Sequence, residues 1–138
     1  MKKTALIILI ITGLFITSAK AQGKDGVTKT PPKIILTKLL NTASLKNQEV
    51  KMIVVTIQPG ETSPGHRHPI PTFAYVIEGE FESTFNGKTH IYKAGDAFYE
   101  EPNKLHALTR NLSKDKPAKL LAIFIGDKGK PFIIPEKK

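Results

Sequence analysis

The chain contains no cysteine among its 138 residues. This absence excludes disulfide bonds, thiolate metal ligands and a lipid anchor attached to cysteine. Basic residues outnumber acidic residues by 21 to 12 and give a formal charge of +9. Apart from Lys2-Lys3 and Lys137-Lys138 they are scattered, and they form no run interleaved with aromatic residues. A nucleic-acid partner is therefore not expected. The charge instead predicts a solvated surface that attracts anions weakly.

A long apolar run is also missing, except near the start of the chain. There Lys2-Lys3 precedes an apolar stretch over residues 5–16, and Ala19-Lys20-Ala21 has the small-x-small pattern of a cleavage site. The stretch is shorter than the ~20 apolar residues that a membrane-spanning helix needs. We therefore expect a bacterial-type signal peptide over residues 1–21, cleaved after Ala21, and a secreted or periplasmic mature chain that does not associate with the membrane. A retained N-terminal anchor is the alternative.

No segment repeats the 3.6-residue period of an amphipathic helix, and no internal repeat occurs. Residues 22–33 are rich in glycine, lysine, threonine and proline and are expected to form a flexible leader. Short apolar or alternating segments follow, and Asn86-Gly87 is the strongest hairpin signal between them. The pattern predicts an all-β sandwich or barrel. The expected strands cover residues 33–40, 49–58, 72–78, 80–85, 88–93, 97–99, 105–110, 118–125 and 132–135.

Three histidines are the candidate metal ligands. In His66-Arg67-His68 the two imidazoles are two residues apart, and residues i and i+2 of an extended chain point to the same face. His106 lies downstream, and three neutral imidazoles with open coordination positions form a catalytic type of metal site. The alternative is a pair of exposed loop histidines beside prolines. The fourth histidine, His90, lies within a predicted strand and is expected to be a surface or sheet residue.

The residues around these histidines resemble the two motifs of the cupin superfamily. Gly60, followed after five residues by His66-x-His68 and after ten more by Gly79, resembles the first motif, and residues 95–106 resemble the second. The resemblance implies a single cupin jelly-roll β-barrel (a double-stranded β-helix of the RmlC-like type) over residues 34–135. It also implies that His66, His68 and His106 bind one divalent metal.

The chain departs from the family pattern at the position of a glutamate ligand, because Thr72 stands there. We expect Thr72 to face the same cavity as the histidines. Loss of the carboxylate favours Fe(II), Zn or Ni over manganese. Glu100 and Glu101, shortly before His106, could accept hydrogen bonds from imidazole N–H groups, but the favoured interpretation is that both are solvated loop carboxylates. Asn103 also replaces a glycine of the second motif.

The resemblance leads to two functional hypotheses. The first is a small metal-dependent enzyme whose three-histidine centre binds and polarises the oxygens of a small, anionic substrate. Dioxygenase chemistry is its leading reaction class, and an isomerase or a decarboxylase is the alternative. The second is a non-catalytic cupin that binds a small acid, a sugar or a metal, which the missing glutamate and the lack of a clear acid–base pair favour. Neither hypothesis assigns a catalytic residue. The resemblance further implies a homodimer, with the apolar stretch 34–36 as the candidate interface.

Overall fold

The computed structural model describes residues 30–137. The predicted signal peptide (1–21) and most of the predicted leader (22–33) therefore lie outside the described residues. All regular elements in residues 30–137 are strands, which confirms the expected all-β class. Within the same residues, no helix is long and apolar enough to cross a membrane.

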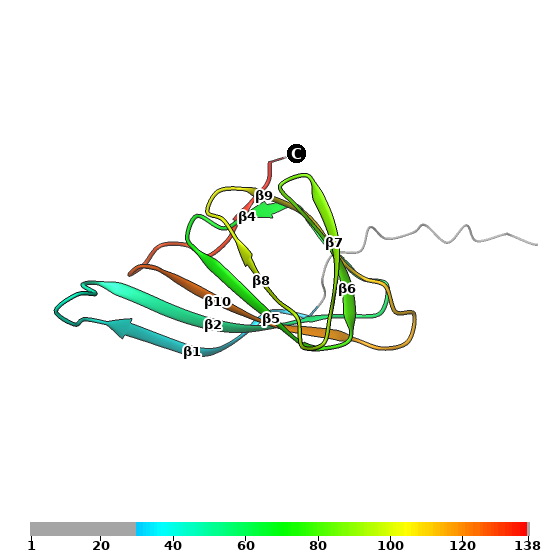
Figure 1. The fold of residues 1–138 in the computed structure, drawn as a ribbon, viewed down its shortest axis with the longest axis horizontal. Helices are drawn as coiled ribbons and strands as arrows, with labels where there is room; N and C mark the ends of the chain where they lie inside the picture. The colour runs from blue at the N-terminus through cyan, green and yellow to red at the C-terminus, as the bar shows by residue number, and fades with distance from the viewer. Residues whose placement is uncertain (1–29, 138) are drawn as a thin grey trace, which may run out of the picture.

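Two antiparallel sheets form the barrel (Figure 1). The first sheet has the spatial order β1 (Lys33–Leu40), β2 (Gln48–Ile57), β10 (Ala118–Asp127), β5 (Thr72–Glu78), β8 (Ala97–Glu100). The second has the order β11 (Ile134–Pro135), β4 (His66–Arg67), β9 (Leu105–Asn111), β6 (Glu80–Phe85), β7 (Lys88–Lys93), and β3 (Thr62–Ser63) also pairs with β9. Strands distant in sequence, such as β2, β10 and β5, are neighbours, which is the connectivity of a jelly roll.

Most predicted strands agree with the observed ones within two residues at either end. The β6–β7 hairpin turns at Asn86-Gly87, whose φ angles of 48° and 75° are those that the sequence predicts for this dipeptide. Two short strands beside the first histidines, β3 and β4, are absent from the prediction. Strand β8 also extends one residue further than predicted, through Glu100, and this extension affects the site.

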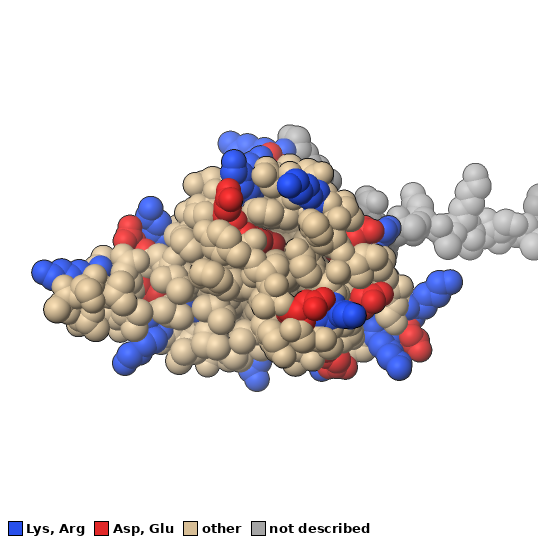
Figure 2. Space-filling model, in the orientation of Figure 1, with Lys and Arg blue, Asp and Glu red and all other residues tan. Residues whose placement is uncertain are grey.

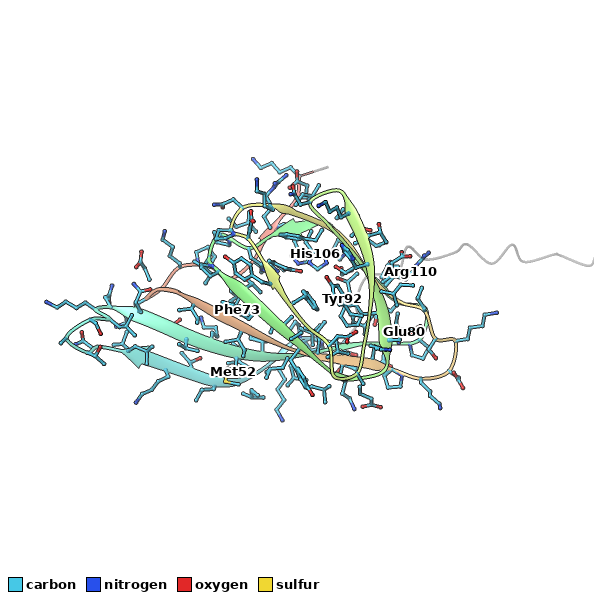
Figure 3. The ribbon with its side chains drawn as sticks, in the orientation of Figure 1. Met52, Phe73, Glu80, Tyr92, His106 and Arg110 are labelled. Atoms are coloured by element: carbon cyan, nitrogen blue, oxygen red, sulfur yellow. The ribbon has the colours of Figure 1, made fainter. Side chains whose placement is uncertain are left out.

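Inward-facing and outward-facing residues alternate along the strands, and many of the inward-facing side chains are apolar and fill the interior of the barrel. Phe81 of β6 and Val76 of β5 are completely buried, and Ile53, Ile57 and Phe124 are 1–4% exposed. Burial of each such side chain contributes about 1.5–3 kcal/mol to stability. Figure 3 shows His106 inside the same barrel, so the strands that bury the core also direct this histidine inward.

Two turns of the barrel require residues that tolerate a positive φ. Gly79 has φ 77°, and a Cβ atom there would lie 2.9 Å from the Ala118 Cα atom, so a larger residue would displace β10. Asn103 has φ 63°, a conformation that asparagine accepts better than most residues. The backbone N–H of Asn103 donates a hydrogen bond to the backbone carbonyl of His68 at 2.7 Å. The turn before β9 is therefore tied to the first histidine pair although it lacks the family's glycine.

Charged side chains lie scattered around the margin of the face seen in Figure 2, and they do not gather into a patch on it. The outer face of the first sheet is apolar instead. Phe73, Tyr75 and Ile77 of β5 and Tyr99 of β8 are each 44–46% exposed, and the rings of Phe73 and Tyr99 lie 5.0 Å apart. The first sheet thus presents apolar side chains on both of its faces.

Candidate metal centre

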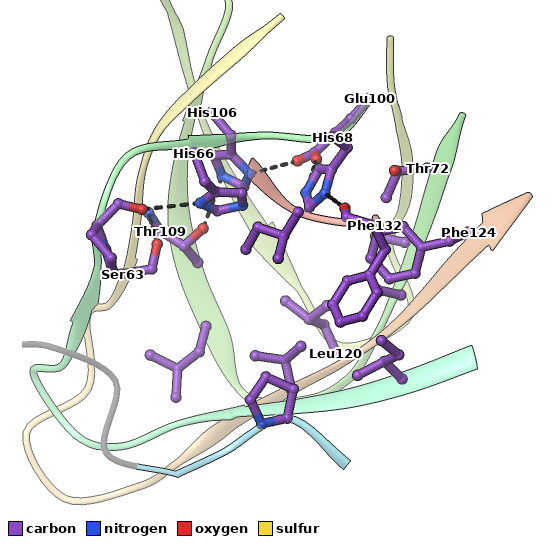
Figure 4. A pocket seen from close by; sticks show the side chains of 18 of the residues that line it. Ser63, His66, His68, Thr72, Glu100, His106, Thr109, Leu120, Phe124 and Phe132 are labelled. Carbon is purple, nitrogen blue, oxygen red and sulfur yellow. Dashed lines mark hydrogen bonds and ion pairs between the residues drawn. The ribbon is translucent and has the colours of Figure 1, made fainter. Parts of the chain in front are cut away.

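The structure brings the three predicted histidines into one cluster (Figure 4). His66 and His106 are direct partners across the β4–β9 pair, and His68 follows β4 immediately. The ligand-capable atoms of the three residues all lie within 4.8 Å of one another. His68 and His106 are 7% and 6% exposed, whereas His66 is half-buried. The fourth histidine, His90, lies exposed on β7, outside the cluster.

Backbone carbonyls orient two of the imidazoles. His66 Nδ1 lies 3.0 Å from the carbonyl oxygen of Pro64, and His68 Nδ1 bonds to the carbonyl oxygen of Phe132. A carbonyl can only accept, so in each ring Nδ1 carries the hydrogen. In the neutral ring Nε2 is then unprotonated, which is the form that binds a metal.

Two hydroxyl groups hold the third imidazole. His106 Nε2 lies 2.9 Å from Ser83 Oγ on β6 and 2.8 Å from Thr109 Oγ1 on its own strand. His106 and Thr109 are three residues apart, so in a regular strand they would point to opposite faces. The register between β6 and β9 shifts here, with Thr84 opposite Leu108 but Phe85 opposite His106. This bulge turns both His106 and Thr109 towards the interior.

Glu100 also faces the cluster, so its interpretation as a solvated loop carboxylate is wrong. It is 3% exposed, and its oxygens lie 2.9 Å from His106 Nδ1 and 3.2 Å from His68 Nε2. The physical reason is strand alternation: β8 includes Glu100, so when Tyr99 points outward Glu100 points inward. Glu101 is exposed, as expected for a loop carboxylate.

The donor atoms of this cluster fit a bound cation. His106 Nδ1 is buried and has no partner with hydrogen-bond geometry, although a Glu100 oxygen lies 2.9 Å away. His68 Nε2, which is unprotonated in the neutral ring, also faces a carboxylate oxygen. When the His106 hydrogen is on Nε2, where a hydroxyl of Ser83 or Thr109 can accept it, both imidazole nitrogens that face Glu100 carry lone pairs. These nitrogens and the carboxylate oxygens then repel each other unless a positive charge lies between them. A divalent metal would satisfy these atoms together.

The pKa shifts favour the same protonation states. Burial lowers the pKa of His66 from 6.5 to about 4, although the Pro64 carbonyl opposes this shift. Burial would raise the pKa of Glu100, but hydrogen bonds that the His106 and His68 imidazoles can donate to the carboxylate, when they carry a proton on that side, outweigh this effect and lower the pKa from 4.5 to about 2. At neutral pH the His66 ring is therefore neutral and Glu100 is charged, and these are the forms that coordinate metals.

Thr72 lines the same cavity and is 2% exposed. Its hydroxyl donates a hydrogen bond to the carbonyl oxygen of Ile70 at 3.1 Å. Thr72 and Glu100 are direct partners in the β5–β8 pair. Position 72, which is a glutamate in the family pattern, is therefore directly opposite a glutamate of this chain on the neighbouring strand.

The histidines occupy one end of a cavity of about 310 Å³. Its other walls are mainly apolar, and Thr30 and Pro32, at the end of the predicted leader, also contribute to them. Among the described residues no lysine or arginine lines this cavity. The apolar lining residues are Ile53, Val55, Ile57, Ala74, Phe81, Phe98, Leu120, Ala122, Phe124, Phe132 and Ile133.

The C-terminal segment closes one side of the cavity. Phe132 and Ile133 line it, and β11 pairs with β4, which carries His66. Glu136 forms an ion pair with Arg67 at 2.8 Å, and Arg67 also donates to the carbonyl of Asn103 at 2.8 Å. The end of the chain therefore fixes the strand that presents the first histidine pair.

Sequence reasoning missed several groups that orient the ligands. The carbonyls of Pro64 and Phe132 carry no signal in the sequence, because every residue has a carbonyl. Ser83 gave a weak signal in the sequence. It lies two residues after the buried Phe81 and so faces the interior from β6, where an apolar residue is usual. Thr109 was hidden by the bulge, which breaks the two-residue period.

Comparisons with known proteins agree with this fold. The sequence profile of the cupin domain family (Cupin_2) matches residues 53–124. The pectin degradation protein KdgF of Dickeya dadantii is 32% identical over 63 residues, which are 45% of this chain and 57% of that protein. The match thus spans little more than half the length of this curated relative.

Solved structures show the same fold. An uncharacterised Klebsiella pneumoniae protein with a double-stranded β-helix domain has a TM-score of 0.58 at 22% identity, over 86% of this chain and 90% of that one. DMSP lyase DddQ of Ruegeria pomeroyi has a TM-score of 0.56 at 25% identity, over 64% and 45%. KdgF of a Halomonas species has a TM-score of 0.54 at 19% identity, over 71% and 79%. With a family profile that covers more than half of its residues and a double-stranded β-helix fold, the chain belongs to the cupin family.

Proposed function

We propose that this cupin holds a divalent metal at His66, His68 and His106 and uses it to act on a small, mostly apolar molecule that carries an oxygen-bearing head. The observation that carries the proposal is the position of the polar cluster at one end of an otherwise apolar cavity. A bound divalent cation would supply Lewis acidity and polarise an oxygen of the ligand. The apolar walls would hold the rest of the ligand and exclude water.

The cavity lining narrows the class of ligand. A polyhydroxylated sugar is held by several hydrogen-bonding side chains placed around its ring. Besides the metal cluster, the polar side chains that the described residues offer to the cavity are the hydroxyls of Thr30, Ser63, Thr72 and Thr109. This lining favours diketones, flavonols and catechols, in which adjacent oxygens can bind at the metal end. A pectin-derived acid is the second candidate, because a curated relative is a pectin degradation protein.

Dioxygenase chemistry is the reaction class that we propose for such a ligand. Both atoms of O₂ would enter the product, so the reaction needs no external reductant. A non-catalytic binding protein is the alternative. It is favoured by the absence, among the described cavity-lining residues, of any side chain outside the metal cluster that could serve as a general acid or base near neutral pH.

The test combines metal analysis with oxygen uptake by the purified mature chain. The panel contains diketones, flavonols and catechols on one side and uronic acids on the other. We expect about one equivalent of bound metal per chain, and oxygen uptake with a diketone, flavonol or catechol. Both should be lost in His106→Ala and kept in His90→Ala. A metal-loaded chain that binds panel members without turnover would support the non-catalytic alternative. A chain that binds no divalent metal would overturn the proposal.

We also propose that the chain is exported and that its mature form begins at Gln22. The support is the order of basic, apolar and small residues over positions 1–21. N-terminal sequencing of protein from the periplasmic fraction tests this. A cytoplasmic protein that retains Met1 would contradict it.

A further inference from the structure

The least expected feature of the site is a buried carboxylate on a different strand from the one that carries the glutamate of the family pattern. The family pattern places a glutamate on the strand that follows the first histidine pair, and this chain has Thr72 there. Glu100 of the neighbouring strand β8 nevertheless directs its carboxylate into the cluster. We propose that Glu100 is a fourth ligand of the metal and replaces, from β8, the carboxylate that is missing at position 72. This inference rests on the proposed metal-binding function.

The strand register makes the replacement geometrically reasonable. Thr72 and Glu100 are direct partners across the antiparallel β5–β8 pair, and both are buried on the inner face. Side chains of such partners project from the same face with Cβ atoms about 4.5–5.5 Å apart. A glutamate side chain is long enough to span that separation, so a carboxylate from either position can reach the same space.

The contacts of Glu100 place its two oxygens between two imidazoles. One oxygen lies 2.9 Å from His106 Nδ1 and the other lies 3.2 Å from His68 Nε2. The side chain is 4% exposed, and no lysine or arginine is among the described residues that line the cavity. A buried carboxylate without a cation is costly. A metal held jointly with the histidines removes that cost.

An orienting role for Glu100 does not explain these contacts. A carboxylate that only orients imidazoles accepts hydrogen bonds from their N–H groups. The hydrogen of His68 is on Nδ1, where it bonds to the Phe132 carbonyl, so in the neutral ring Nε2 has none to give to Glu100. His106 Nδ1 likewise has no partner with hydrogen-bond geometry, Glu100 included. Coordination of one cation accounts for both contacts.

This assignment changes the electrostatics expected from the sequence. Three imidazoles leave the full charge of a divalent metal uncompensated, whereas an added carboxylate reduces the net charge of the centre by one. Attraction for an anionic ligand is then weaker than a three-histidine site would give. Carboxylate ligands also favour harder metals such as manganese. The preference against manganese that Thr72 suggests is therefore offset by Glu100.

The experiment measures Mn(II) and Zn(II) affinities of chelator-treated chains by competition titration. Glu100→Gln keeps the shape of the side chain, and Glu101→Gln removes the same charge from the exposed neighbour as a matched control. Glu100→Thr and the double variant Thr72→Glu/Glu100→Thr test whether position 72 can supply the carboxylate. Melting temperatures of the metal-free variants check that each one folds. Glu100→Gln provides the answer if the double variant does not fold.

We expect Glu100→Gln to lose more than ~100-fold in Mn(II) affinity, beyond the ~10–100-fold that loss of a merely orienting group costs. Its loss of Zn(II) affinity should be smaller, and Glu101→Gln should match the wild type. The double variant should recover at least tenfold of the affinity that Glu100→Thr loses. If Glu100→Gln binds both metals as Glu101→Gln does, Glu100 is not a ligand while the three-histidine site survives. If the wild type binds neither metal, the proposed function fails together with this inference.

Discussion

At the scale of single residues, the site depends on which atom of each imidazole is already engaged. Two carbonyls bind Nδ1 of His66 and His68, and two hydroxyls bind Nε2 of His106. His66 and His68 therefore have Nε2 free to bind a metal, whereas His106 has Nδ1 free. The one buried nitrogen without a hydrogen-bond partner among the described side chains, His106 Nδ1, is also the atom that faces Glu100.

Thr72→Glu provides a residue-scale prediction about the metal-free chain. The new carboxylate would stand directly across from Glu100 in the β5–β8 pair, and like charges at opposed positions destabilise a sheet. The side chain would also be desolvated, since Thr72 is 2% exposed. We expect a loss of about 1–3 kcal/mol in unfolding free energy without metal, partly recovered by saturating Mn(II). Thermal melts with chelator and with Mn(II) measure both. Unchanged metal-free stability would show that position 72 does not face the cluster.

The pH dependence of the metal-free chain follows from the pKa shifts of His66 and Glu100. The pKa of His66 falls from 6.5 to about 4 on folding, so between these values the unfolded chain binds a proton that the folded chain does not. Its contribution to stability is complete above pH 6.5 and is lost as the pH falls towards 4. The lowered pKa of Glu100 gives a second loss from pH 4.5 towards 2.

Melting temperatures in chelator between about pH 8 and 4 test this dependence. The fall below pH 6.5 should be smaller in His66→Gln than in the wild type and unchanged in His90→Gln. Equal pH profiles for the wild type and His66→Gln would mean that the folded chain does not hold this imidazole neutral.

At the scale of elements, the last strand and the segment that leads into it are part of the site. Phe132 supplies both a wall of the cavity and, through its carbonyl, the acceptor for His68, while β11 covers β4. Most hydrogen bonds and strand pairings that position the histidines therefore come from the second sheet and from the segment that follows Asp127.

Removal of residues 132–138 tests this dependence. Without the Phe132 carbonyl, His68 loses its orienting acceptor, and we expect a loss of ~10–100-fold in metal affinity. Phe132→Ala is the matched control, because it keeps the carbonyl and removes the ring. It should retain metal affinity within about threefold but weaken binding of an apolar ligand. If the truncated chain folds and binds metal as the wild type does, the C-terminal segment does not orient His68.

The strands and the histidine cluster follow from local patterns, whereas Glu100 required the strand boundary. Thr72–Glu78 and Glu80–Phe85 were predictable because they are short segments, rich in apolar, aromatic or β-branched residues, that turn signals bound. Glu100 precedes a Glu-Pro-Asn turn, so the sequence alone gave no reason to extend β8 by one residue. That one residue decides between a solvated carboxylate and a buried one. The bulge in β9 and the pairing of β11 arise from contacts distant in sequence, which no local pattern reports.

At the scale of the whole molecule, the apolar outer face of the first sheet favours self-association. Tyr75 and Phe73 lie beside the half-buried Leu121 and Ile123 of β10, and exposed apolar patches of this kind mark interaction surfaces. The predicted interface over residues 34–36 belongs to β1, an edge strand of the same sheet. We therefore expect a homodimer that uses this sheet.

Sedimentation of the mature chain at several concentrations measures the association. Tyr75→Glu should shift the dimer towards monomer by at least tenfold in dissociation constant, because it puts a charge into the apolar face. Ile91→Glu on β7 of the second sheet is the control, since Ile91 is 58% exposed on the opposite side of the barrel and should leave the dimer unchanged. A wild-type chain that stays monomeric at every concentration would rule out this interface.

The pairing of β11 with β4 has a practical consequence for anyone who purifies this protein. Glu136 is held against Arg67, so the C-terminal end of the chain is anchored within a few residues of His66. A polyhistidine affinity tag fused there would introduce a second chelator beside the natural one and would confound every metal titration. Fusion at Gln22, in place of the preceding segment, leaves that end untouched, and a protease site would allow the tag to be removed before metals are added.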